Sequence, residues 1–185
     1  MWPDVLVRLL PFTLAYAIAY GVSGRAPWLG LESGALLSQA VFAVVGVPVM
    51  FVAAVALQLR LTRRRGALNV PADGADAWFQ GAFYLVNGPV EEAFFRGLMQ
   101  GGLSVLWGAP AGFAVATAIY VVYHRLGQWP WSETLATALL GVPMGLAYWL
   151  LPGPPSLLGV SLVHIAATCG FLGPGPYLLR KLRLL

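Results

Sequence analysis

The chain has 185 residues, of which 59% are hydrophobic and only 10% are charged. Because a soluble domain carries about a quarter charged residues, this composition excludes a water-soluble globule and indicates a surface that mostly faces lipid. The formal net charge of +4 does not indicate nucleic-acid binding, since the basic residues cluster at the ends of apolar runs, where they act as topology anchors near anionic lipid.

Apolar segments follow one another along the chain, separated by short stretches rich in Gly, Pro or Arg. Most approach the ~20 residues that a helix needs to cross a membrane. The third is too short to cross alone, so we interpret it as an interfacial or re-entrant helix that leads into the next crossing, and we expect about six crossings. This pattern predicts an all-α, multi-pass transmembrane bundle that forms a single domain over residues 1–185. The segments are Val5–Val22, Ala35–Leu61, Trp78–Val86, Pro89–Trp107, Ala109–Tyr123, Thr134–Leu151 and Ser156–Leu172.

The positions of Arg and Lys predict the orientation in the cell membrane. Basic residues follow the second, fourth and sixth crossings, which all end on one side, whereas Arg25 falls on the other side. Because cytoplasmic loops carry the positive excess, we expect both termini in the cytoplasm. The residues counted are Arg60, Arg63, Arg64, Arg65, Arg125, Arg180, Lys181 and Arg183.

Two pairs of glycines stand four residues apart. Gly97 with Gly101, and Gly141 with Gly145, each lie on one face of a predicted helix. Small residues at this spacing let neighbouring backbones approach closely. We therefore expect helix packing at both pairs.

The stretch NGPVEEAFFRG places two adjacent carboxylates and an arginine in an apolar segment. Each charge there costs on the order of 3 kcal/mol, so the three together need a reason. Asn87 is a good cap and Pro89 suits a first helical turn, which predicts a helix that begins here with its acids near the positive end of the helix dipole.

On that helix Glu92 and Arg96 are four apart and can form an ion pair, which leaves Glu91 outside the pair. Two carboxylates so close in a dry site cannot ionise independently, so one of them is a candidate base. The alternative is an ion-pair network between helices that performs no reaction.

The chain's two histidines also lie in apolar segments. His124 closes the fourth crossing and His164 lies in the middle of the sixth. A single histidine on an apolar face is usually a core residue, but two of them beside a double glutamate indicate a functional site. If the helices close into a bundle, Glu91, His124 and His164 can share one polar cavity.

The strings EEAFFRG, YVVYH and HIAAT, in this order, resemble the three motifs of the CPBP family of CAAX proteases and bacteriocin-processing enzymes. The resemblance covers about residues 88–170, and the spans within about 1–75 look like a variable addition. It implies a multi-pass glutamic intramembrane endopeptidase that acts on a membrane-associated protein or peptide and requires no cofactor or metal.

The family pattern also implies a role for each residue. Glu91 would activate water, His124 would hold or share its proton, and His164 with Thr168 would steady the oxyanion. The sequence departs from the pattern at Tyr120, where Phe is usual, and at Thr168, where Asn or Asp is usual. The catalytic candidates are thus Glu91, His124, His164 and Thr168, with Glu92, Arg96 and Tyr120 in support.

Other mechanisms and functions remain open from the residues themselves. Two glutamates and two histidines are also a plausible zinc set, although the H-E-x-x-H helix is absent. Gly21–Gly24 matches a rhomboid-like G-x-S-G string, and Cys169 could be proposed as a nucleophile, although a buried free cysteine is normally inert. The non-enzymatic alternatives are a scaffold or immunity-type protein of the same fold, which Thr168 favours, and a proton-coupled transporter.

The predicted orientation can be measured with reporter fusions. Fusions at both termini and after Arg65 should all report the cytoplasmic side. A C-terminal fusion that reports the external side would mean an odd number of crossings, and the interpretation of Trp78–Val86 would then be wrong.

Overall fold

The structure, a computed structural model, describes residues 2–65, 70–127 and 129–184, and the regular elements among them are all helical. The side chain of Arg65, which is one of the counted basic residues, lies outside this description. The helices are α1 (Trp2–Asp4), η1 (Val5–Leu9), α2 (Leu10–Val22), η2 (Pro27–Leu29), α3 (Leu36–Arg65), α4 (Gly74–Glu92), η3 (Ala93–Gly101), α5 (Gly102–Trp107), α6 (Ala109–Tyr123), η4 (His124–Gly127), α7 (Trp131–Ala136), α8 (Ala138–Leu150), α9 (Leu157–Phe171) and α10 (Pro174–Lys181).

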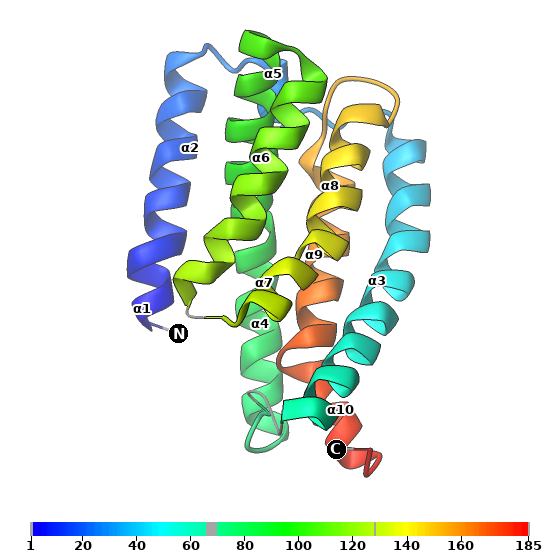
Figure 1. The fold of residues 1–185 in the computed structure, drawn as a ribbon. Coiled ribbons are helices and arrows are strands. Elements are labelled where there is room, and N and C mark those ends of the chain that lie inside the picture. The colour runs from blue at the N-terminus through cyan, green and yellow to red at the C-terminus, as the bar shows by residue number, and fades with distance from the viewer. Residues whose placement is uncertain (1, 66–69, 128, 185) are drawn as a thin grey trace. The chain divides into compact units, whose positions relative to one another are not determined.

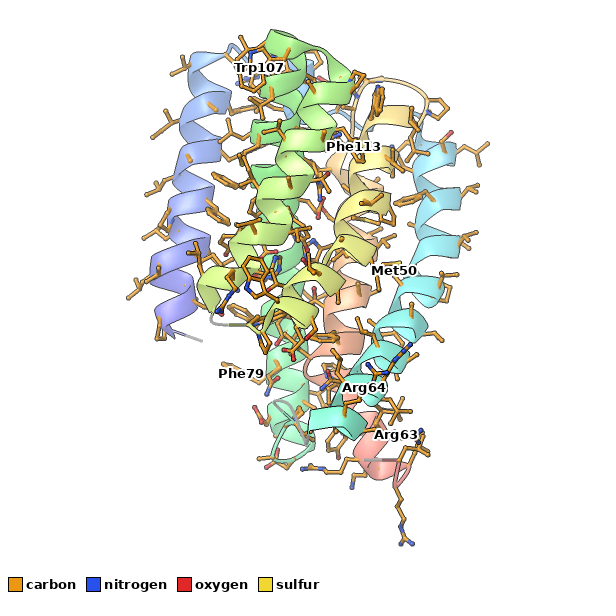
Figure 2. All side chains as sticks on the ribbon, in the orientation of Figure 1. Met50, Arg63, Arg64, Phe79, Trp107 and Phe113 are labelled. Carbon is orange, nitrogen blue, oxygen red and sulfur yellow. The ribbon has the colours of Figure 1, made fainter. Side chains whose placement is uncertain are left out.

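The helices present apolar side chains outward, as a membrane protein requires. Two helical stretches, Val5–Val22 and Leu36–Arg64, are long and apolar enough to cross a bilayer. Only 6% of the most apolar 18-residue part of each stretch is buried inside the protein. The bent pair α9 and α10, at 41° to each other, qualifies as a third if it counts as one span. Side chains such as Phe79 and Trp107 project from the helices (Figure 2) and are largely exposed. The predicted all-α membrane bundle is confirmed, whereas the number of crossings stays a prediction.

The helix that carries the two glutamates does not begin where the sequence predicts. Asn87 and Pro89 lie inside α4, and α4, η3 and α5 follow one another without a break from Gly74 to Trp107. Trp78–Val86 is therefore not a separate short helix. Proline removes one N–H donor, whereas unwinding a turn in an apolar segment would leave several backbone groups without partners, so the helix continues through Pro89.

The chain forms two compact units. The first comprises Met1–Phe42 and Val90–Val160, and the second comprises Ala43–Pro89 and Ser161–Leu185. In the first unit η3 packs against α2 and α6, and α6 also packs against α8 (Figure 1). Gly108, at a φ of 87°, makes the turn between α5 and α6, a conformation that glycine adopts without strain.

Aromatic side chains form the core of the first unit around η3. Phe95 and Tyr120 are buried, and their rings meet edge to face at 5.2 Å. Phe12 of α2 stacks on Phe94 at 4.0 Å and meets Phe95 edge to face at 5.5 Å. These contacts fix the N-terminal helix against the helix that carries the glutamates.

In the second unit, α9 packs closely on glycines of α3 and α4. A Cβ at Gly46 would come within 2.7 Å of Val163, and one at Gly88 within 2.9 Å of Ile165. The start of α4 is capped, since the backbone N–H of Asp76 donates to Asp73 Oδ1 at 2.9 Å. A hydrogen bond from the Ala72 backbone, and then one from Gln80, hold the pKa of Asp76 below its usual value.

The glycine pairs have the packing role that their spacing predicts. A Cβ at Gly97 would lie 2.5 Å from the carbonyl oxygen of Leu29, and one at Gly101 would overlap the carbonyl of Trp28. On α8, a Cβ at Gly141 or Gly145 would lie 2.8 Å from the ring of Tyr120 or Phe113. Both pairs therefore allow close approach within the first unit.

The backbone contact at Gly101 yields a matched test. Gly101→Ala should lower stability by about 1–3 kcal/mol, since the new methyl group meets a carbonyl that cannot move alone. Gly102→Ala is the control, because its Cβ would lie 3.5 Å from the Trp28 ring, an ordinary contact. Thermal unfolding of both variants in detergent measures the difference, and equal melting temperatures would contradict the close approach.

Candidate functional site

The two glutamates end α4, and the turn after them is wider than an α-helix. Glu91 and Glu92 are both buried, and η3 follows as a π-helix. Such helices are rare and occur frequently at functional sites, because the extra residue re-aims the side chains of that turn. The local backbone thus gives Glu91, Glu92 and Arg96 their directions.

Arg96 is fully buried and organises a polar network. Its Nε donates to Glu92 Oε2 at 3.3 Å, which is the ion pair that the spacing predicts. Its Nη1 donates to Gln100 Oε1 at 3.4 Å and to Thr117 Oγ1 at 3.3 Å. The guanidinium carbon lies 5.1 Å from the centre of the Tyr120 ring, within cation–π range. Glu92 therefore belongs to a network that joins η3 to α6.

Glu91 has a different partner, which the sequence analysis did not identify. Its Oε1 accepts a hydrogen bond from Arg8 Nη1 at 2.6 Å. Arg8 lies in η1 and also contacts Asp4 at 3.1 Å. A signal for this residue exists in the sequence, since Arg8 is a charge within the apolar segment Val5–Val22, where a charge needs a partner.

His124 follows α6 as the first residue of η4, and its imidazole has a defined orientation. Its Nδ1 lies 2.8 Å from the carbonyl oxygen of Tyr120. A carbonyl oxygen only accepts, so Nδ1 carries the proton, and a neutral ring then has its lone pair on Nε2. The rings of Tyr120 and Trp129 lie 4.7 Å and 5.4 Å from the imidazole. This arrangement suits a group that holds or passes a proton.

Tyr120 connects the polar network to the histidine. Its ring faces Arg96 on one side and meets His124 edge to face. The first unit thus brings together the predicted residues Glu91, Glu92, Arg96, Tyr120 and His124.

His164 and Thr168 belong to the second unit. Both lie on α9, one helical turn apart, so they point toward the same side of that helix. His164 is buried and Thr168 is half-buried. Their meeting with Glu91 and His124, which are residues of the first unit, stays a prediction.

The buried polar residues that the sequence analysis did not identify include Gln100, Thr117 and Glu133. Gln100 and Thr117 bind Arg96, and Gln100 also donates to the carbonyl of Gly145 at 2.8 Å. Glu133 is buried in α7. The spacing of Gln100, four residues after Arg96, is a helical signal, whereas the partner on α6 depends on packing.

Two of the alternative chemistries can be compared with the described residues. Within residues 2–65, 70–127 and 129–184, no group of three or more His, Cys, Asp or Glu side chains is arranged to hold a metal. The Ser23 hydroxyl is buried and has no hydrogen-bond partner among the described residues, so no base is in contact with it there. A serine nucleophile needs a base within hydrogen-bond reach.

The comparison with protein families decides the class of the protein. The family model described as type II CAAX prenyl endopeptidase Rce1-like matches residues 73–169, more than half of the chain. The chain belongs to the Rce1-like family. The matched residues include the catalytic candidates from Glu91 to Thr168. The match begins before the stretch NGPVEEAFFRG, and it does not include Arg8. No curated protein and no solved structure matches the chain.

Membership of the Rce1-like family confirms the resemblance to the CPBP family that the three motifs indicate. It supports a CAAX-type intramembrane protease, which is a hydrolase embedded in a membrane. It also implies a membrane-associated protein or peptide as substrate.

Proposed function

We propose that the chain is a glutamic-type intramembrane endopeptidase, with Glu91 as the base that activates water. The observation that carries the proposal is the separation of the two buried glutamates. Glu92 pairs with Arg96 on its own helical stretch, whereas Glu91 pairs with Arg8 of the N-terminal helix. Two adjacent carboxylates in different surroundings can take different roles, one structural and one catalytic.

Hydrolysis then proceeds by general base catalysis. Glu91 takes a proton from water while the water oxygen attacks the carbonyl carbon of the scissile peptide bond. His124 holds or shares that proton, which passes to the leaving amine as the carbon–nitrogen bond breaks. The orientation of His124 by the Tyr120 carbonyl supports this role, because the lone pair of the neutral ring is then on Nε2.

The developing oxyanion requires donors aimed at it. His164 and Thr168 lie on one side of α9 and can both donate, so we assign them this role. The assignment requires α9 to line the same cavity as Glu91. The bilayer topology proposed with it has about six crossings and both termini in the cytoplasm.

Replacement of Glu91 by glutamine should reduce cleavage at least ~10²-fold, since a general base contributes that much or more and an amide cannot accept the proton. Glu92→Gln should also reduce stability, by roughly 3–5 kcal/mol, because it leaves the Arg96 charge buried without its carboxylate. Cleavage of lipid-anchored fluorogenic peptides in liposomes, with thermal unfolding in detergent, separates the two effects.

Glu32→Gln is the matched control, because Glu32 is an exposed glutamate of the first unit. It should change neither activity nor melting temperature. Near wild-type cleavage by Glu91→Gln would refute the glutamic mechanism, and loss of wild-type activity with a chelator would favour the zinc alternative.

The oxyanion role predicts the effect of removing the Thr168 hydroxyl. Thr168→Val keeps the branched shape and should lower kcat by roughly 10²–10³, the usual effect of losing one such donor. Thermal stability should change little, because the shape is kept. Thr13→Val on α2, at an exposed threonine, provides the control for the same chemical change.

Unchanged turnover in Thr168→Val would mean that a backbone group or water donates beside His164. Thr168→Asn should retain or raise activity if the longer side chain fits. An inactive wild-type protein that gains cleavage through Thr168→Asn would instead indicate a non-catalytic scaffold of the same fold.

A further inference from the structure

The N-terminal helix reaches the proposed base directly. Arg8 Nη1 donates to Glu91 Oε1 at 2.6 Å, although the two residues are 83 positions apart in the chain. The Glu91 side chain is 2% exposed and that of Arg8 is 22% exposed. A charge-assisted hydrogen bond in so dry a place is short and directional, so it restricts the plane of the carboxylate.

Two sets of contacts hold Arg8 in this position. Asp4, one helical turn earlier, pairs with Nη2 at 3.1 Å. Phe12, one turn later, stacks on Phe94 at 4.0 Å and meets Phe95 at 5.5 Å. Because Phe94 and Phe95 follow Glu91 by only three and four residues, the aromatic contacts set the register of the N-terminal helix against the glutamate.

We propose that Arg8 is a positioning residue for Glu91. The N-terminal helix then contributes a residue to the active site. This inference rests on the proposed function, because it takes Glu91 as the base. The guanidinium transfers no proton and stays charged throughout. Its role is to hold the carboxylate where a water molecule and the scissile carbonyl can meet it, since a misplacement of about 1 Å can cost ~10²-fold in rate.

The same contact has an opposing effect. The lone pair of Glu91 Oε1 that accepts from Arg8 is not available to take a proton from water. If this second effect were dominant, Arg8 would be inhibitory and its removal would raise the rate. The sign of the change in kcat therefore decides between positioning and inhibition.

Arg8→Gln should lower kcat by about 10²-fold with KM changed less than about twofold, because the residue acts on the base and not on substrate binding. Arg8→Lys keeps the charge and should recover about tenfold or more of the lost rate, although it lacks the fork of the guanidinium. Arg25→Gln is the control, since Arg25 is an exposed arginine near the other end of α2. It should leave kcat unchanged.

A double-mutant cycle on thermal stability measures the contact between Arg8 and Glu91 without an activity assay. Arg8→Gln should lower the melting temperature in the wild-type background, because it leaves a buried carboxylate without its cation. In the Glu91→Gln background the same change should have a much smaller effect, since no carboxylate remains. If Arg8→Gln does not fold, Arg8→Lys supplies both the kinetic and the thermal comparison.

The outcomes separate the two hypotheses. Cleavage by Glu91→Gln would overturn the proposed function itself. Loss of cleavage in Glu91→Gln, together with an unchanged or raised kcat in Arg8→Gln, would overturn only the positioning role. Equal thermal shifts in both backgrounds would show that Arg8 does not bind Glu91 and would also overturn it.

Discussion

The structure depends on the buried guanidinium of Arg96 and the groups that neutralise it. Removing a charge from water is costly, and in an apolar bundle the protein must supply every partner itself. Here Glu92 supplies the opposite charge, Gln100 and Thr117 supply acceptors, and Tyr120 supplies its ring face. Because these partners come from the end of α4, from η3 and from α6, the network fixes how η3 packs against α6.

The network is possible because the surrounding helices approach closely. Gly141 lies against the Tyr120 ring, and Gly97 and Gly101 lie against the backbone of η2. Larger side chains at these positions would move α8 or η2 away from the polar cluster. Tyr16 further fixes η2, since its hydroxyl donates to the carbonyl of Leu29 at 2.7 Å. The glycines therefore allow the close helix packing that the polar network around Arg96 requires.

The difference between the two glutamates arises from their neighbours, because the residues themselves are chemically identical. Glu92 faces a cation on its own helical stretch, one turn later, whereas Glu91 faces Arg8 from the N-terminal helix. A cation from a separate helix thus holds one carboxylate, and Arg96 holds the other. In the proposed mechanism this division leaves one acid structural and the other catalytic.

The sequence by itself determined the features that depend on composition and local spacing. The excess of apolar residues indicated a membrane bundle, the spacing of Glu92 and Arg96 predicted their ion pair, and the three motifs indicated the family. The tertiary structure alone decided the partners that are distant in the chain, such as Arg8 for Glu91. It also decided that the helix continues through Pro89, because the need to satisfy backbone groups in lipid outweighs a local breaking signal.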